Sequence, residues 1–341
     1  MFESIQFQNF KALRDATLKL RPFNLIVGPN GSGKSTVIQA LAAVSRLQPN
    51  VWIANSDFDR FRTVGPKPSE IRVRLQWSGD LADRAKTASW APGMASLGIA
   101  DLRPGQPHGG AADIDAQSFI SAIRVYALEP NAIAAAVQLQ PNMELERNGR
   151  NLAGVLDRLR DSHEEVFDGL KAELRNWLPE FDNLVFETPG SGMRSIQLRQ
   201  AFSKQVIASS DLSDGTLIAL ALLAIAYSPN PPSLVCLEEP DRGLHPRLLR
   251  DVRDALYRLS YPEQFKLARK PVQVIATTHS PYFVDLFKDH PEEIIVAEKN
   301  SDGTASFKSL AEDEKLRELI GEAPLGEVWY SGVLGGVPAA K

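Results

Sequence analysis

The stretch from residue 28 to residue 35 constrains the fold of this chain more than any other. It reads Gly-Pro-Asn-Gly-Ser-Gly-Lys-Ser and matches the phosphate-binding pattern G-x-x-x-x-G-K-[ST] at every defined position. An apolar run at 23–27 precedes it and a helical apolar pattern at 36–44 follows it, which predicts strand, glycine loop and helix in succession. The chain is therefore expected to be an α/β protein with a site for a nucleoside triphosphate.

The residue types in this P-loop suit separate tasks in phosphate binding. Glycines allow backbone amides to turn toward phosphate oxygens, and the N-terminus of the following helix adds partial positive charge. Lys34 is expected to reach the outer phosphates and Ser35 to offer its hydroxyl to magnesium. The residues predicted to bind the nucleotide are Gly28, Pro29, Asn30, Gly31, Ser32, Gly33, Lys34, Ser35 and Thr36.

Composition limits what the whole surface can attract. The 341 residues carry a formal net charge of −4, which argues against a general attraction to nucleic acid or anionic membranes and leaves a local basic patch open. The single cysteine, Cys236, excludes a disulfide framework and fits a reducing compartment, so a cytoplasmic location is expected. No membrane segment is expected, because the longest apolar run, 217–227, is too short to cross a bilayer.

Hydrophobic periodicity separates β-rich from helical regions. Apolar residues recur at helical spacing over 152–178, and Pro179 ends that region. Residues 88–118 are dense in Ala, Gly, Pro, Ser and Asp and are predicted to form a mobile insertion. Strands are predicted within 5–20, at 71–77, at 123–128, and as a hairpin at 196–199 and 205–207. Three lobes are expected: 1–87 with the P-loop, 88–190 with the insertion and the helical region, and 191–341 with the motifs described next.

Two further motifs carry groups that act on phosphates. The segment 211–216, Asp-Leu-Ser-Asp-Gly-Thr, opens an apolar helix and offers an anion cradle, although it also suits an ordinary N-cap with a tight turn. An apolar strand at 233–238 ends in Glu238 and Glu239. Glu238 is expected to orient magnesium through water and Glu239 to polarise the attacking water, whereas a charged turn is the simpler alternative.

A third motif places a histidine at the end of a buried strand. Residues 272–277 are apolar enough for such a strand, and Thr278-His279-Ser280-Pro281 follows it. An imidazole there can hydrogen-bond a γ-phosphate and report its presence. A lone histidine at a strand end is more often structural, so the weight of His279 comes from the order and spacing of the motifs.

The order of these motifs resembles that of the ATP-binding-cassette (ABC) ATPases. Within them, the chain resembles the RecF/SMC-related branch and is similar to the soluble AAA-type ATPases that group with the overcoming-lysogenisation-defect (OLD) nucleases. The segments that carry this resemblance are 5–11, 151–156, 238–246, 278–281 and 325–338.

The resemblance implies a fold and a pair of cofactors. The fold is a single ABC-type ATPase domain over 1–341, with a mixed β-sheet flanked by helices, a helical subdomain and no long coiled coil. The cofactors are ATP and Mg²⁺. By the same resemblance the protein works as a homodimer or higher oligomer, or pairs with a related head, because each ATP site is shared between two subunits.

The resemblance also assigns roles within that composite site. ATP held by 28–36 of one subunit meets the signature residues of a second, which are Ser213, Asp214 and Gly215. Glu239 is the general base and His279 the switch, while Ser35 and Glu238 hold magnesium. Most cassettes carry Asp where this chain has Glu238, so slow turnover is expected. The glutamine that couples magnesium to the helical subdomain stays unassigned between Gln76 and Gln138.

Relatives of this kind point to an ATP-gated switch as the leading function. They are frequently components of anti-phage defence, or of systems with a separately encoded effector such as a nuclease or TOPRIM-like protein. The sequence after His279 is expected to be too short for the TOPRIM nuclease domain of full OLD proteins.

Two other functions compete with this one. A RecF-like DNA repair clamp draws on a helix that carries Arg247, Arg250, Arg253 and Arg258, although these arginines also suit a solvated face. The ATPase subunit of a membrane transporter is disfavoured by the OLD-like segments. No membrane partner is therefore expected.

Overall fold

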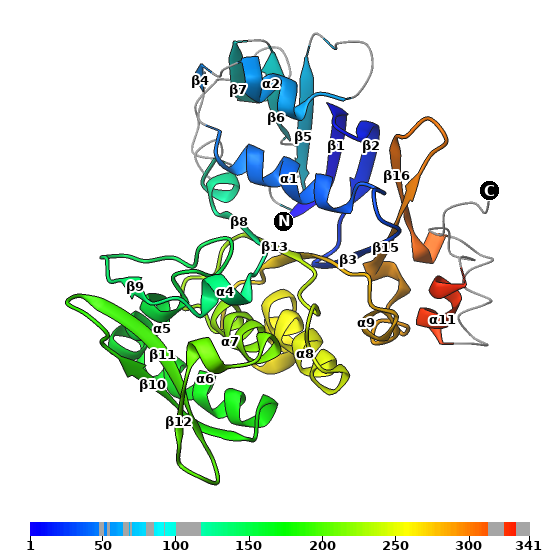
Figure 1. Ribbon diagram of the computed structural model, residues 1–341. Helices are drawn as coiled ribbons and strands as arrows, with labels where there is room; N and C mark the ends of the chain where they lie inside the picture. Colours follow the sequence, from blue (N-terminus) through cyan, green and yellow to red (C-terminus); the bar gives the residue numbers. More distant parts are fainter. Residues whose placement is uncertain are drawn as a thin grey trace. The chain divides into compact units, whose positions relative to one another are not determined.

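The computed structural model describes residues 1–47, 51–52, 55–63, 68, 70–79, 85–91, 93–99, 117–312 and 324–331. Its contacts divide the chain into two compact units (Figure 1). Unit 1 comprises 1–125, 232–236 and 271–341, and unit 2 comprises 126–231 and 237–270. Both units are built from segments distant in sequence, so they cut across the three predicted lobes. Within the described ranges, no helix has the length and apolar character needed to cross a membrane.

An antiparallel sheet in unit 1 packs against the helix that follows the P-loop. Its strand order is β2-β1-β5-β6-β7-β4. Alternation of apolar and polar residues in β1 and β5 buries one face, and that face shares a core with Val37, Ile38 and Leu41 of α1. The bounds are β1 Phe2–Phe10, β2 Leu13–Lys19, β4 Val51–Trp52, β5 Ile71–Trp77, β6 Ala85–Ala91, β7 Met94–Ile99 and α1 Lys34–Ser45, with α2 at Asn55–Phe61.

The β6–β7 hairpin corrects one expectation. The prediction of a mobile insertion over 88–118 is wrong for 88–91 and 94–99, where β6 and β7 pair in antiparallel register with Trp90 opposite Ala95. Trp90 is buried, and Ala88 faces the core beside it. The Trp90 ring contacts the rings of Phe10 and Phe61, so the hairpin joins the core of unit 1. Residues 100–116 lie outside the described residues.

A second sheet in unit 1 contains the strand that leads into the P-loop. Its order is β16-β15-β3-β14-β13-β8, and β3 pairs in parallel with both β14 and β15, while β15 and β16 are antiparallel. Every residue of β3 and of β14 is buried, as expected of central parallel strands. The bounds are β3 Phe23–Val27, β8 Ile123–Tyr126, β13 Leu234–Glu238, β14 Gln273–Thr277, β15 Ile294–Lys299 and β16 Ala305–Ser309.

Unit 2 is organised around one buried helix. Helix α7 spans Asp214–Ala226, is buried at every residue from 216 to 226, and contacts four other helices of the unit. A continuous apolar run of this kind suits a helix surrounded on all sides. The surrounding helices are α4 Pro130–Ile133, α5 Leu152–Ser162, α6 Glu164–Trp177 and α8 Leu249–Ser260.

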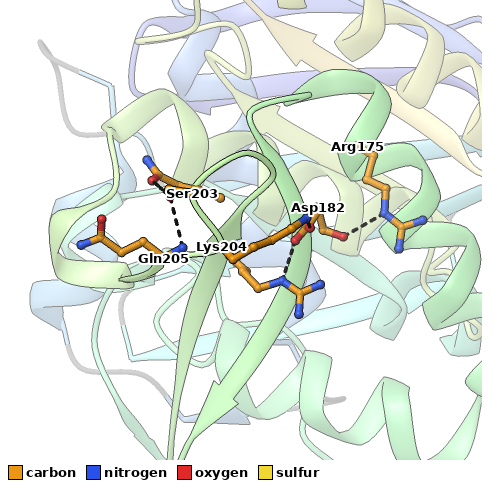
Figure 2. Close-up of polar contacts among 7 residues, drawn as sticks. Arg175, Asp182, Ser203, Lys204 and Gln205 are labelled. Carbon is orange, nitrogen blue, oxygen red and sulfur yellow. Dashed lines mark hydrogen bonds and ion pairs between the residues drawn. The ribbon is translucent and has the colours of Figure 1, made fainter.

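A small antiparallel sheet completes unit 2. Its strands are β10 Phe181–Glu187, β11 Met193–Gln200, β12 Val206–Ala208 and β9 Val137–Gln138, and β11 and β12 form the predicted hairpin. Figure 2 shows Asp182 of β10 beside the hairpin tip, where its carboxylate accepts from Arg199 and Lys204. Those two hydrogen bonds lower the pKa of Asp182 to about 2. The tip is therefore tied to β10 by charge as well as by the sheet.

Candidate functional site

The P-loop follows β3 and turns through three glycines of positive φ. Gly28, Gly31 and Gly33 have φ of 152°, 76° and 97°. A Cβ on Gly28 would lie 2.3 Å from the carbonyl oxygen of Ala297, and a Cβ on Gly33 would lie 2.8 Å from Ala305 Cβ. A Cβ on Gly31 would meet no described atom within 4 Å. Gly28 and Gly33 therefore leave no room for a side chain, and the positive φ favours glycine at all three positions.

Lys34 supplies a buried positive charge to this loop. The side chain is only 5% exposed, and Nζ donates to the carbonyl oxygens of Gly28 and Pro29, both at 2.8 Å. An ammonium group that leaves water needs such acceptors to offset its desolvation. The loop thus holds a preorganised cation, as a site for an anionic ligand requires.

The hydroxyls of Ser32 and Ser35 bear on whether the P-loop fits a nucleotide. Ser32 Oγ is fully buried and has no hydrogen-bond partner among the described residues, while Ser35 is exposed. A glycine cradle, a buried ammonium and an unsatisfied buried hydroxyl together match the donor set that binds phosphate oxygens. The residues present therefore fit the phosphates of ATP, and the Ser35 hydroxyl is available to hold Mg²⁺.

β14 brings His279 to the same edge of the sheet as the P-loop. Thr277 lies opposite Ile26 in the parallel pairing of β14 with β3. Gly28 and His279 each follow this pair by two residues, and His279 is half-buried. The parallel register thus delivers the P-loop and the predicted switch residue together.

The residues that flank His279 are fixed by short-range hydrogen bonds. Thr278 is fully buried, and its Oγ1 accepts from the backbone N–H of Ser280 at 2.9 Å. Ser280 Oγ in turn accepts from Phe283 N–H at 3.3 Å and caps α9, which spans Pro281–Asp285. The backbone at His279 is therefore held between a buried strand end and a capped helix.

Glu238 ends β13 and forms an ion pair with Arg147, which sequence analysis missed. Nη2 of Arg147 lies 3.1 Å from Oε1 of Glu238, and the side chains are 45% and 23% exposed. Burial raises the pKa of Glu238, the positive charge of Arg147 opposes this, and Glu239 adds to the increase. Arg147 belongs to no recognisable motif, so nothing in the sequence pairs it with Glu238.

Glu239 adopts a backbone conformation that residues with a side chain rarely take. Its φ is 47°, and its carbonyl accepts from Arg242 N–H at 3.0 Å in the turn that follows β13. Holding a side-chain-bearing residue in such a region costs about 1–3 kcal/mol, and such strain is concentrated at active sites. Glycine would relieve this strain, so a glutamate at this position carries a conformational cost.

The signature segment forms the N-terminus of α7. Ser213 is the N-cap: its Oγ accepts from Thr216 N–H at 3.2 Å and lies 2.8 Å from Thr216 Oγ1. A Cβ on Gly215 would lie 2.8 Å from the carbonyl oxygen of Gly243, which has φ of 73°. Gly215 therefore allows the signature helix to pack on the turn that follows the two acids. The N-cap interpretation describes this geometry, while phosphate binding by these residues in a second subunit stays a prediction.

The arginines of α8 and of the short turn Pro246–Leu248 before it do not form one basic face. Arg247 donates through Nη2 to the carbonyl oxygen of Trp177 at 2.8 Å, and the Arg258 guanidinium lies over two aromatic rings, 4.9 and 5.7 Å from their centroids. Arg253 pairs with the aspartate that follows it, whereas Arg250 is exposed. Two of the four arginines therefore serve packing inside unit 2, which neither sequence interpretation anticipated.

The predicted site residues fall into two groups. Unit 1 holds the P-loop and His279, and unit 2 holds Ser213, Asp214, Gly215, Glu238 and Glu239. Gln76 lies in β5 of unit 1 and Gln138 in β9 of unit 2. Neither glutamine gains an assigned role from its position.

Sequence comparison identifies AAA-type relatives. A family model described as "AAA domain, putative AbiEii toxin, Type IV TA system" matches residues 103–285, more than half of the chain, and one described as "AAA ATPase domain" matches residues 1–75. The chain is 24% identical over 361 residues to an OLD nuclease of Thermus scotoductus, a match that covers 92% of this chain and 65% of that protein. It is 37% identical over 78 residues to the lipoprotein-releasing system ATP-binding protein LolD of Maricaulis maris, covering 22% of this chain and 26% of that one. The chain thus spans less than two thirds of either relative.

Structural comparison identifies the fold. An SMC head bound to the C-terminal winged-helix domain of ScpA superposes with a TM-score of 0.64 at 16% identity and covers 91% of this chain and 99% of that chain. An SMC head of Pyrococcus furiosus bound to the C-terminal domain of ScpA gives a TM-score of 0.62 at 16% identity, covering 94% and 99%. The fold is therefore that of an ABC-ATPase head, as the motif order predicts, and the longest described helix, α6, has 14 residues.

Proposed function

We propose, since the chain belongs to the AAA-domain family whose model matches residues 103–285, that it binds ATP with Mg²⁺ and hydrolyses it as an ATP-gated dimeric switch. The observation that carries the proposal is the P-loop cradle, which combines the buried Lys34 charge, the unsatisfied Ser32 hydroxyl, and two glycines whose positions leave no room for a Cβ. The strained Glu239 supports hydrolysis in addition to binding.

The residues divide the chemistry of phosphoryl transfer among them. Bound Mg²⁺ supplies Lewis acidity at the phosphates, and Ser35 and Glu238 are the residues that would hold it. Lys34 stabilises negative charge on the outer phosphate oxygens. Glu239 accepts a proton from the attacking water, and His279 donates a hydrogen bond to the terminal phosphate. Since His279 and the P-loop follow two strands that pair in parallel, the terminal phosphate can bias the conformation after β14.

A second copy of the chain completes the site. Ser213, Asp214 and Gly215 present a helix N-terminus, which attracts an anion through its amides and partial positive charge. ATP held by one subunit would thus bind the signature helix of the other, and hydrolysis would release it. The switch acts through the different affinity of its two states for a partner.

The proposed biological role is inferred from the proteins that this chain resembles. We place the chain in the cytoplasm as the regulatory ATPase of an anti-phage defence or nuclease-effector system, because one relative is an OLD nuclease and the description of the matched family reads "putative AbiEii toxin, Type IV TA system". The effector is a separately encoded protein such as a nuclease or TOPRIM-like protein. A RecF-like clamp is the alternative, and it predicts ATP-dependent DNA binding that weakens steeply with added salt.

Mass measurement of a hydrolysis-deficient variant tests the proposal. Glu239→Gln keeps the size of the side chain and removes the base, so ATP is expected to trap this variant as a dimer while the nucleotide-free protein stays smaller. Lys34→Ala in the same background is the control and should stay unchanged when ATP is added. An identical mass with and without ATP, together with no effect of Lys34→Ala, would contradict the switch.

A further inference from the structure

The loop from 139 to 151 brings Arg147 to Glu238, the acid predicted to hold magnesium. Both residues belong to unit 2, and they form a 3.1 Å contact between Nη2 and Oε1. Glu238 is 23% exposed, so this partner faces a carboxylate that is largely out of water. A charge pair in such a place is stronger than one at a fully hydrated surface.

The backbone on both sides of Arg147 is anchored to the segment that leaves β8. Ala127 N–H donates to the carbonyl oxygen of Arg147 at 2.8 Å, and Glu129 N–H donates to that of Asn148 at 3.1 Å. Gly149 has φ of 80°, and a Cβ there would lie 2.6 Å from Ile133 Cγ1. The backbone at Arg147 is thus held by hydrogen bonds to residues 127 and 129, so it stays in place when the side chain leaves Glu238.

A buried asparagine shapes the rest of the loop. Asn151 is 4% exposed, its Oδ1 accepts from Glu146 N–H at 2.8 Å, and its Nδ2 donates to the carbonyl oxygen of Glu144 at 2.6 Å. Three residues beyond Arg147, Arg150 is exposed and lines a cavity beside the loop. The loop therefore offers two arginines on a hydrogen-bonded backbone, of which Arg147 contacts the acid.

A hard divalent cation and a guanidinium make competing demands on one carboxylate. The guanidinium of Arg147 donates to Oε1, and its positive charge repels a second cation brought to the same carboxylate. We propose that Arg147 is a positioning residue that occupies Glu238 and must be displaced when Glu238 engages the metal of a bound nucleotide. The inference rests on the proposed function, and it makes the 139–151 loop an element that responds to the metal through Glu238.

Metal affinity tests this competition directly. Mn²⁺ serves as the probe on the full chain at pH 8, with the protein in excess over a non-hydrolysable ATP analogue so that little analogue is free to bind Mn²⁺ by itself. Electron paramagnetic resonance reads the free Mn²⁺ fraction, and a titration of the analogue without protein is subtracted. Arg147→Ala and Arg147→Gln are expected to lower the half-saturating Mn²⁺ concentration roughly two- to fivefold, because a partly exposed ion pair no longer competes. Arg147→Lys retains a point charge and should stay near the wild type. Arg150→Ala is the matched control on the same loop and should not change the affinity.

The outcomes separate this inference from the proposed function. If the wild type binds Mn²⁺ only with the analogue, and Arg147→Ala and Arg147→Gln bind it equally or more weakly, Arg147 does not compete and the inference is overturned while the ATP site stands. If the analogue creates no Mn²⁺ site even in the wild type, both fail. Thermal unfolding confirms that each variant is folded, and Arg147→Gln keeps most of the aliphatic stem if Arg147→Ala does not fold.

Discussion

The P-loop and the acidic turn at 238–243 both lie at the end of a buried strand, but the positively charged side chain that contacts each comes from a different place in the sequence. Lys34 belongs to the P-loop motif itself and contacts carbonyls five and six residues earlier in the chain. The acidic turn is contacted by Arg147, 91 residues away, and by the signature helix at Gly215. The P-loop is therefore largely specified by a local pattern, whereas the environment of the acids arises only when distant segments fold together.

Removal of the Lys34 side chain from the P-loop should give the largest effect of the predicted changes, a loss of ATP hydrolysis. Lys34→Ala removes the preorganised charge and is expected to lower ATP hydrolysis by about 100-fold or more. Steady-state phosphate release measures this. Lys19→Ala, at a lysine on an exposed surface pair, is the control and should retain wild-type rates. A Lys34→Ala chain with near-normal turnover would remove the basis for calling this loop the catalytic cradle.

The two ends of the P-loop should respond differently to an added methyl group. Gly28→Ala forces a Cβ to 2.3 Å from a backbone oxygen, and an expected loss of roughly 3 kcal/mol in unfolding free energy follows from the clash and the strained φ. Gly31→Ala has open space and should cost only about 1–2 kcal/mol from its positive φ. Urea unfolding of both variants provides the comparison. Equal losses would mean that backbone conformation, and not packing on Ala297, sets the requirement.

The parts of the molecule that depend on a local pattern of residues can be predicted from the sequence. The order of motifs predicts the ABC-ATPase fold, because strand, glycine loop and helix are set by residues close together in the chain. The β6–β7 hairpin could not be predicted, because Ala and Ser have weak strand preferences. Trp90 is the one large apolar side chain in β6 that marks its buried face. The contact of Arg147 with Glu238 could not be predicted either, because an ion pair between residues 91 positions apart produces no pattern in the sequence.

The acidic turn can be probed through the signature helix. Gly215→Ala directs a Cβ to 2.8 Å from the carbonyl oxygen of Gly243 and is expected to destabilise unit 2 by about 1–2 kcal/mol. Gly169→Ala in α6 meets only the edge of a tyrosine ring at 3.2 Å, and the higher helix propensity of alanine should make it neutral or stabilising. Differential scanning calorimetry should show a lower unfolding temperature for Gly215→Ala and an unchanged or higher one for Gly169→Ala. A neutral Gly215→Ala would show that the helix and the turn do not restrain each other.

The strain at Glu239 should give the smallest change, and a stabilising one. Glu239→Gly adopts φ of 47° without steric cost and is expected to gain about 1 kcal/mol while losing hydrolysis. Glu239→Ala also loses the carboxylate but keeps the strained Cβ, so it should not gain stability. If both variants unfold at the wild-type temperature, the positive φ carries no stored cost.

Mixing two inactive variants tests the composite site most directly. Lys34→Ala disables the P-loop, and Ser213→Asp keeps the helix cap while placing a negative charge where a second subunit's phosphate is predicted to bind. If each site combines the P-loop of one subunit with the signature of the other, a mixed dimer contains one site with both parts intact. Random pairing should then restore about a quarter of wild-type ATP hydrolysis. A mixture that stays as inactive as its components would contradict a site shared between two subunits.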